Sequence, residues 1–134
     1  MPNLDKTREL LEVAFIDGWG TTTPIKFDNV KFDDSNIDSF VSISFINYDS
    51  NNVNINSINL RRIRHTGVFA TKVYVKQNIG SSKAYFFADK IRGIMDNLNQ
   101  ANLFTTASST RRNGAKDDGW FGLIVDTPYT SDEE

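Results

Sequence analysis

The sequence predicts an α+β fold: a two-layer sandwich whose mostly antiparallel central sheet has about four to six strands, with two main helices on one face. Two segments place apolar residues at helical spacing, and several others alternate apolar and polar residues as half-buried strands do. The alternating segments are joined by short turns, which favours neighbouring strands on one sheet. One core is expected for a chain of 134 residues.

The first helix is predicted over 4–16, where apolar residues recur mostly at intervals of three and four. Asn3 or Asp5 is available as its N-cap. Gly18 follows the periodic segment and is the predicted end of the helix, because glycine readily adopts the left-handed conformation found there.

A long irregular region separates this helix from the first clear strand. Pro24 and the threonines before it indicate a loop that leads into a short extended segment over 25–30. A region of this length in a small domain is a candidate contact loop. The strand itself is predicted over 40–46, and its core-facing residues are Val41, Ile43 and Phe45.

The next extended region of the chain includes Gly67. Residues 48–59 contain many asparagines and are predicted to form a turn-rich hairpin tip. The segment LRRIRH follows at 60–65. The segment VFATKVYVK, at 68–76, alternates apolar and polar residues as a strand does. A pair of strands around Gly67, or one long strand with a bulge there, fits equally well.

The second helix carries the clearest periodic pattern of the chain. Ser81 or Ser82 is available to cap it. Its apolar stripe consists of Ala84, Phe87, Ala88, Ile91, Ile94, Met95 and Leu98.

The C-terminal third is predicted to complete the sheet. A strand is expected over 102–107, an exposed polar loop over 108–119, and a final strand over 120–129. Residues 1–127 form the single expected domain. Residues 128–134 end in an acidic stretch, which we expect to be a disordered tail.

Composition excludes several function classes. The chain has no cysteine, so it has no disulfide, thiolate metal site or thiol nucleophile. Its net charge of −2 does not indicate general nucleic-acid or membrane binding, and its N-terminus resembles neither a signal peptide nor a membrane span, so a soluble intracellular chain is expected. The apolar fraction of 39% is modest, yet ten residues are phenylalanine; we expect a partner or a second copy to bury some of this aromatic surface.

Catalytic chemistry finds little support in the residues. His65 is the single histidine, which excludes paired-histidine metal sites, and no serine lies in a G-x-S-x-G elbow. The pairs Asp33–Asp34 and Asp117–Asp118 lie in predicted loops, where turn formation is a commoner role for aspartate than metal binding. We predict no catalytic residue, metal or cofactor, and keep a small metal-dependent hydrolase using the aspartates and His65 as the alternative.

Two basic groups remain to be explained. The first consists of Arg61, Arg62 and Arg64 before the central strand, and the second of Arg111, Arg112 and Lys116 in the late loop. One interpretation is a strand edge protected from aggregation by charge. The other is that the guanidinium groups bind carboxylates of a neighbouring subunit. Sequence-specific DNA recognition is disfavoured, because no predicted helix has a basic face.

A longer pattern carries a family resemblance. The chain reads R-x-x-G-V-F-A-T-K-V-Y-V after a polar hairpin, then a glycine-containing turn and A-x-x-F-A-D-K-I. In this pattern it resembles the tail terminator family of long-tailed phages, the group that contains lambda-type minor tail protein U, from about residue 25 to residue 125. The matching residues are Arg64, Gly67, Val68, Val73, Val75, Gly80, Ala84, Ala88, Asp89 and Ile91.

The resemblance implies a small α+β subunit of a homo-hexameric ring at the head–tail junction of a virion, assembled in the host cytoplasm. Such a ring caps the head-proximal end of the tail tube, ends tube polymerisation and provides the docking surface for the head-completion or connector protein. Genomic DNA passes through the ring without sequence-specific binding, and no membrane is involved. A head-completion or stopper protein of the neck is the near alternative.

A ring also requires that two different flanks of the subunit be complementary, because cyclic contacts are head-to-tail. We therefore expect the first basic group to meet an acidic group of the neighbouring subunit. The candidate acidic residues lie in the early irregular region and are Asp28, Asp33, Asp34 and Asp38. The late basic loop is a candidate channel-lining or partner-contact segment.

Overall fold

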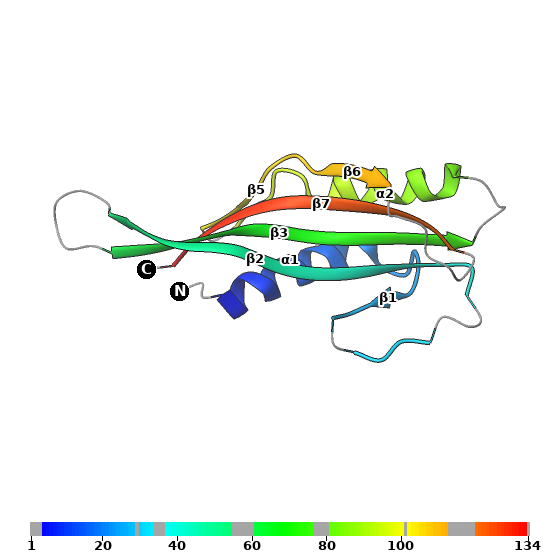
Figure 1. Cartoon of the computed structure of the whole chain (residues 1–134), viewed down its shortest axis with the longest axis horizontal. Coiled ribbons are helices and arrows are strands. Elements are labelled where there is room, and N and C mark those ends of the chain that lie inside the picture. The colour runs from blue at the N-terminus through cyan, green and yellow to red at the C-terminus, as the bar shows by residue number, and fades with distance from the viewer. Residues whose placement is uncertain are drawn as a thin grey trace.

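A computed structural model of the protein describes residues 4–28, 30–33, 37–54, 61–76, 81–100, 102–112 and 120–133. The elements along the chain are α1 (Leu4–Trp19), β1 (Ile25–Lys26), β2 (Ser39–Asn54), β3 (Arg61–Lys76), α2 (Ser82–Met95), β4 (Asn99–Gln100), β5 (Leu103–Thr105), β6 (Ser109–Arg112) and β7 (Trp120–Glu133). The predicted α+β sandwich with two helices is confirmed (Figure 1).

The described residues form one sheet of seven strands, in the order β1-β2-β3-β7-β5-β4, with β6 also paired to β7. Among these strands β1 and β2 run parallel, and the other pairs are antiparallel. The sheet exceeds the expected four to six strands because β1, β4 and β5 have only two or three residues each. Segments that short carry no readable alternation.

α1 buries one stripe of side chains at intervals of four residues, namely Thr7, Leu11, Phe15 and Trp19. The helix continues through Gly18, the predicted end, and stops at Gly20, which has a positive φ of 61°. Gly18 lies at the point of α1 where α2 passes close by. A Cβ atom at Gly18 would lie 2.7 Å from Ile94 Cγ1, so the glycine permits the two helices to approach.

α2 begins after Ser81, which occupies the N-cap position without a side-chain hydrogen bond to the helix. Its C-terminal end is held by polar contacts instead. The Thr105 hydroxyl donates a hydrogen bond to the Met95 carbonyl at 2.6 Å, and Asp96 Oδ1 accepts one from the Ser108 N–H at 2.8 Å. These bonds satisfy groups near the helix end and fasten it to β5 and the segment that follows.

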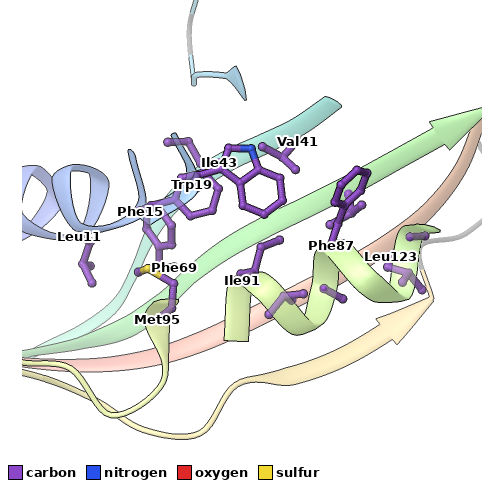
Figure 2. Packing of buried hydrophobic residues seen from close by; sticks show 14 of the residues in the cluster. Leu11, Phe15, Trp19, Val41, Ile43, Phe69, Phe87, Ile91, Met95 and Leu123 are labelled. Carbon is purple, nitrogen blue, oxygen red and sulfur yellow. The ribbon is translucent and has the colours of Figure 1, made fainter. Parts of the chain in front are cut away.

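The main core lies between the helices and one face of the sheet. Figure 2 shows Phe15 and Trp19 of α1 lying with Phe87 and Ile91 of α2 over the strands. The Trp19 ring centroid is 5.4 Å from that of Phe15 and 5.7 Å from that of Phe87. The sheet contributes Val41, Ile43, Phe69, Val73, Val75, Leu123 and Val125. In the described part of the chain, no helix is long and apolar enough to cross a membrane.

A smaller aromatic cluster lies on the opposite face, at one end of the sheet. The Phe40 ring centroid is 4.8 Å from that of Tyr74 and 5.1 Å from that of Trp120. Phe32 and Ile37, from the irregular region, pack against this cluster. The described residues place no helix on this face, so part of it stays open.

β2 and β3 form a hairpin of sixteen residues per strand. The prediction of a turn-rich tip over 48–59 is wrong for 48–54, which continue β2 and pair with β3 as far as Asn54 opposite Arg61. Residues 55–60 lie outside the described part. Asparagine has a low strand propensity. These residues are nevertheless in a strand because they pair with β3, which is itself paired with β7 along its other edge.

A bulge sits opposite Gly67, on the partner strand. β3 passes through Gly67 without interruption, whereas the register of β2 shifts between Asn47 and Asp49. A Cβ atom at Gly67 would lie 2.0 Å from the Ile46 carbonyl oxygen and 2.8 Å from Tyr129 Oη. The Tyr129 hydroxyl donates to Asn47 Oδ1 at 2.7 Å, and burial raises the pKa of Tyr129. The glycine therefore leaves space for the bulged backbone and for the tyrosine.

The acidic C-terminal segment is not a disordered tail. Residues 128–133 form the end of β7 and pair with β3, and Ser131 also pairs with β5. Ser131 is fully buried, and its hydroxyl is 2.7 Å from that of Thr7 in α1. The prediction of disorder is wrong because backbone pairing and this buried contact hold a segment whose composition gives no sign of order.

Replacing Gly67 with alanine is expected to destabilise the protein by about 2–3 kcal/mol, because the added methyl group would collide with the Ile46 carbonyl. Gly93, in α2, provides the control. A Cβ atom there meets nothing within 4 Å, so Gly93→Ala should stabilise the helix by about 0.5–1 kcal/mol. Urea unfolding of both variants measures the two effects, and equal stabilities would contradict this account of Gly67.

Thr71 carries a buried hydroxyl to which none of the described residues offers a hydrogen-bond partner. Thr71→Val is expected to raise the free energy of unfolding by about 1 kcal/mol, because valine has a similar shape and leaves no polar atom unpaired. Thr127 is equally buried, but its hydroxyl is 2.8 Å from that of Ser108. Thr127→Val should therefore cost about 1–2 kcal/mol in the same unfolding experiment. Opposite signs for the two substitutions are the expected result.

Candidate functional site

The first basic group lies on an arm of the sheet. β2 and β3 continue past the N-terminal end of α1, and we call the residues 50–54 and 61–64 the arm (Figure 1). The backbone of Arg61 and Arg62 pairs with the end of β2 in this arm, and for these two residues the structure describes the backbone. Arg64 pairs with both β2 and β7.

Arg64 has a carboxylate partner in its own chain. Its Nε lies 2.8 Å from Asp132 Oδ1 and its Nη2 lies 3.1 Å from Asp132 Oδ2, which is a bidentate pair. The hydrogen bond and the charge of Asp132 raise the pKa of Arg64. The Asp132 side chain is 8% exposed, so the pair fixes β7 to β3. Because Arg64 is engaged within its own chain, the interface hypothesis now depends on Arg61 and Arg62.

Of the predicted acidic partners, Asp28 lies beside the middle of the β2–β3 hairpin and Asp38 lies at the end remote from the arm. Asp28 Oδ1 accepts a hydrogen bond from the Ser44 hydroxyl at 2.9 Å. Asp38 Oδ1 lies 3.6 Å from Lys76 Nζ, beside the last residue of β3. Both are exposed, and both contacts are of the weak kind found at protein surfaces.

The acidic and basic groups are far apart within one chain. Arg64 precedes Lys76 by twelve residues in β3, which at about 3.3 Å per residue separates the arm from Asp38 by roughly 40 Å. Asp33 lies near Asp38 in the sequence, and Asp34 falls outside the described residues. The arm and Asp38 can therefore meet only between subunits.

The second basic group is partly a strand. Arg111 and Arg112 lie in β6, where a loop is predicted, because β7 offers them a pairing edge. Arg111 Nε is 3.1 Å from Asp126 Oδ2, and the Arg112 guanidinium lies 5.3 Å from the centroid of the Phe121 ring. Both arginines are exposed. Lys116 falls outside the described part of the chain.

His65 has the environment of a structural residue. It is 6% exposed, and its Nδ1 lies 2.7 Å from the Ser50 hydroxyl across the hairpin. A general base needs access to a substrate, which a buried ring in a strand lacks. Over the ranges that the structure describes, no three histidine or acidic side chains gather as metal ligands would. Asp117 and Asp118 are outside those ranges.

A groove beside β2 has no counterpart in the sequence predictions. It has a volume of about 430 Å³ and is lined by Arg8, Glu12, Phe27, Asp28, Val30 and Phe45. Arg8 is held between two carboxylates, with Nη2 2.8 Å from Asp5 Oδ1 and Nη1 2.9 Å from Glu12 Oε1. The hydrogen bond from Asp5 and then that from Glu12 raise the pKa of Arg8. The sequence carries only a weak signal for this groove, namely that Arg8 and Glu12 are four residues apart on a predicted helix.

Exposed apolar side chains occur on α2 and near the arm. Phe86 is 64% exposed and Tyr85 is 45% exposed, next to each other in the first half of α2. Ile46, Tyr48 and Ile63 are exposed where the arm leaves the body. They are exposed apolar surface of the subunit, and the burial of such surface by a partner or a second copy stays a prediction.

Replacing Asp132 with asparagine should lower the thermal unfolding midpoint, because the buried amide cannot accept both hydrogen bonds from Arg64. Asp126→Asn is the matched control, since it weakens the exposed pair with Arg111. The control should change the midpoint much less. A larger loss for Asp126→Asn than for Asp132→Asn would contradict the structural role assigned to Arg64 and Asp132.

Comparison with known proteins shows the fold and no more. No protein-family model matches this chain, and none of the curated proteins matches it either. A solved structure whose name states no activity is similar to it, with a TM-score of 0.60 and 16% sequence identity, covering 92% of this chain and 94% of that one. The arrangement of two helices on a long-stranded sheet therefore occurs in another protein of similar length.

Proposed function

We propose that this protein is a structural subunit of a phage tail, a tail terminator that forms a hexameric ring. The ring caps the head-proximal end of the tail tube, ends tube polymerisation and presents the docking surface for the head-completion or connector protein. Genomic DNA passes through it without sequence-specific binding. The site of action is the head–tail junction of the virion, and assembly takes place in the host cytoplasm.

Two lines of argument support this proposal. The sequence pattern around Gly67 and through α2 resembles the tail terminator family, and the observed α+β fold is of the kind that the resemblance implies. The buried, hydrogen-bonded His65 gives no support to a hydrolase. The role proposed is one of binding and assembly, without a metal, a cofactor or a membrane.

The observation that carries the proposal is the two-ended charge distribution of the subunit. The basic arm extends from one end of the hairpin (Figure 1), and Asp38 lies at the other end, beside Lys76. A closed ring uses two different flanks of each subunit, so every arm can meet the acidic flank of a neighbour. Within one chain the distance prevents this contact.

The native mass of the purified protein tests the proposal. Six chains of 15.2 kDa give a ring of about 91 kDa, which is expected in sedimentation over a concentration series and as closed rings in electron micrographs. Arg62→Glu should shift the protein to the mass of one chain while its circular dichroism stays unchanged, because the substitution reverses a charge of the arm. It leaves the Arg64–Asp132 pair in place.

Lys83→Glu is the control, since it makes the same change of charge on the exposed first turn of α2 and should leave the ring intact. Rings that bind purified tail tubes and stop their growth support the terminator role. Rings that bind the head connector but not the tube would instead assign the neck role. A monomer at every concentration, with and without tail tubes, would contradict the proposal.

A further inference from the structure

The sheet ends in two edges of different character. β1 covers the outer edge of β2 at Val41 and Ser42, and beyond this point no described strand lies beside β2. On the other side of the sheet β6 pairs with β7, and its outer edge likewise has no described partner strand. Figure 1 shows the two edges on opposite sides of the subunit. One chain cannot join them, because β3 and β7 lie between.

The backbone of β2 is oriented for further pairing. The Val41 N–H donates to the Pro24 carbonyl at 3.1 Å, so the polar backbone groups of Val41 point toward the outer edge. Alternate residues of a strand point their backbone groups to the same side, which directs those of Ile43, Phe45 and Asn47 outward as well. Such an edge is a template for another strand.

The groove gives this edge an acidic border on both faces. Glu12 reaches it from α1, on the face that carries the helices. Asp28 lies toward the opposite face, where it accepts the hydrogen bond from Ser44. Arg8 lies in the same groove, where it is paired with Glu12, and it also contacts Asp5 of α1.

β6 carries positive charge, and its two arginines are arranged to match the two carboxylates beside β2. All four of its residues, Ser-Thr-Arg-Arg, are exposed. Arg112 pairs with Leu123, which belongs to the helix-covered face, and Arg111 pairs with Ile124, which points to the other face. Facing residues of paired strands lie on the same side of a sheet, so β6 presents one arginine to each face.

We propose that the edge of β2 receives strand β6 of a neighbouring copy of this chain, so that the sheet continues from subunit to subunit. Arg112 of each copy then meets Glu12 of the next on the helix-covered face. Arg111, whose Nε is 3.1 Å from Asp126 Oδ2 of its own chain and whose side chain is exposed, meets Asp28 on the other face. The inference rests on the proposed ring and specifies how its subunits join. A four-residue strand makes a small contact, which suits a closed ring because each subunit is held at two such contacts.

Charge reversal on the two edges tests the proposal. One variant carries Glu12→Lys and Asp28→Lys, and the other carries Arg111→Glu and Arg112→Glu. Each variant alone should lose the ring and sediment as a monomer of 15.2 kDa. An equal mixture should form rings again with the two variants alternating, because each junction between them joins edges of opposite charge: the two reversed edges match each other, and the two unchanged edges match as in the wild type. The chain carrying all four substitutions should form rings again.

Engineered cysteines give a second readout that does not depend on charge reversal. The natural chain contains no cysteine, so Asp28→Cys with Arg111→Cys in one chain should yield disulfide-linked ladders up to six subunits on a non-reducing gel. Either single cysteine variant should yield no ladder.

The outcomes separate the two proposals. If the wild type forms rings and both reversed variants also form rings, this interface is overturned and the ring proposal stands. The same holds if the wild type forms rings and the double-cysteine chain gives no ladder. A wild-type chain that stays monomeric, together with a double-cysteine chain that forms no ladder, would overturn both. If a reversed variant is unfolded by circular dichroism, the cysteine ladder decides the question.

Discussion

The pairing of β3 along both of its edges is the constraint on which the rest of the structure depends. β3 is registered with β2 over its whole length and with β7 from Ile63 to Lys76. Its alternation then places Phe69, Val73 and Val75 under the helices, so that one face of a three-strand platform carries the core. The short strands β1, β5 and β6 add to the edges of this platform. Both helices lie on the surface that the long strands β2, β3 and β7 define.

Close approach between elements determines where small residues are needed. Gly18 allows α1 to pass Ile94 of α2, and Gly67 makes room for the bulged backbone of β2 and for Tyr129. At the far end of the platform the Arg64–Asp132 pair and the buried contact between Thr7 and Ser131 hold β7 against its neighbours. Polar contacts stabilise this end as apolar packing stabilises the centre, because most side chains at these ends of β3 and β7 are polar.

The same architecture leaves surfaces that suit assembly. Both helices cover one face, an aromatic cluster lies at one end of the other, and both outer edges of the platform carry charged side chains: Glu12 and Asp28 beside β2, and Arg111 and Arg112 in β6. A subunit with complementary and separate edges is suited to head-to-tail contacts, which close into a ring when the rotation between neighbours allows it. The exposed aromatic side chains on α2 are far less informative, since they match many kinds of partner.

The sequence by itself determined the fold class, both helices and the core-facing residues of the central strands, because these depend on periodicity that the chain carries locally. Tertiary structure decided the elements whose order comes from a neighbour: the asparagine-rich part of β2, strand β6 and the acidic end of β7 are strands because β3 or β7 supplies the backbone partners. It also decided the candidate site. The sequence proposed Arg64 as an interface residue, whereas Asp132, 68 residues away in the chain, engages it within the subunit. Arg8, Glu12 and Phe45 meet in one groove only after α1 has packed beside β2, and a pattern read along the chain carries no information about such distant neighbours.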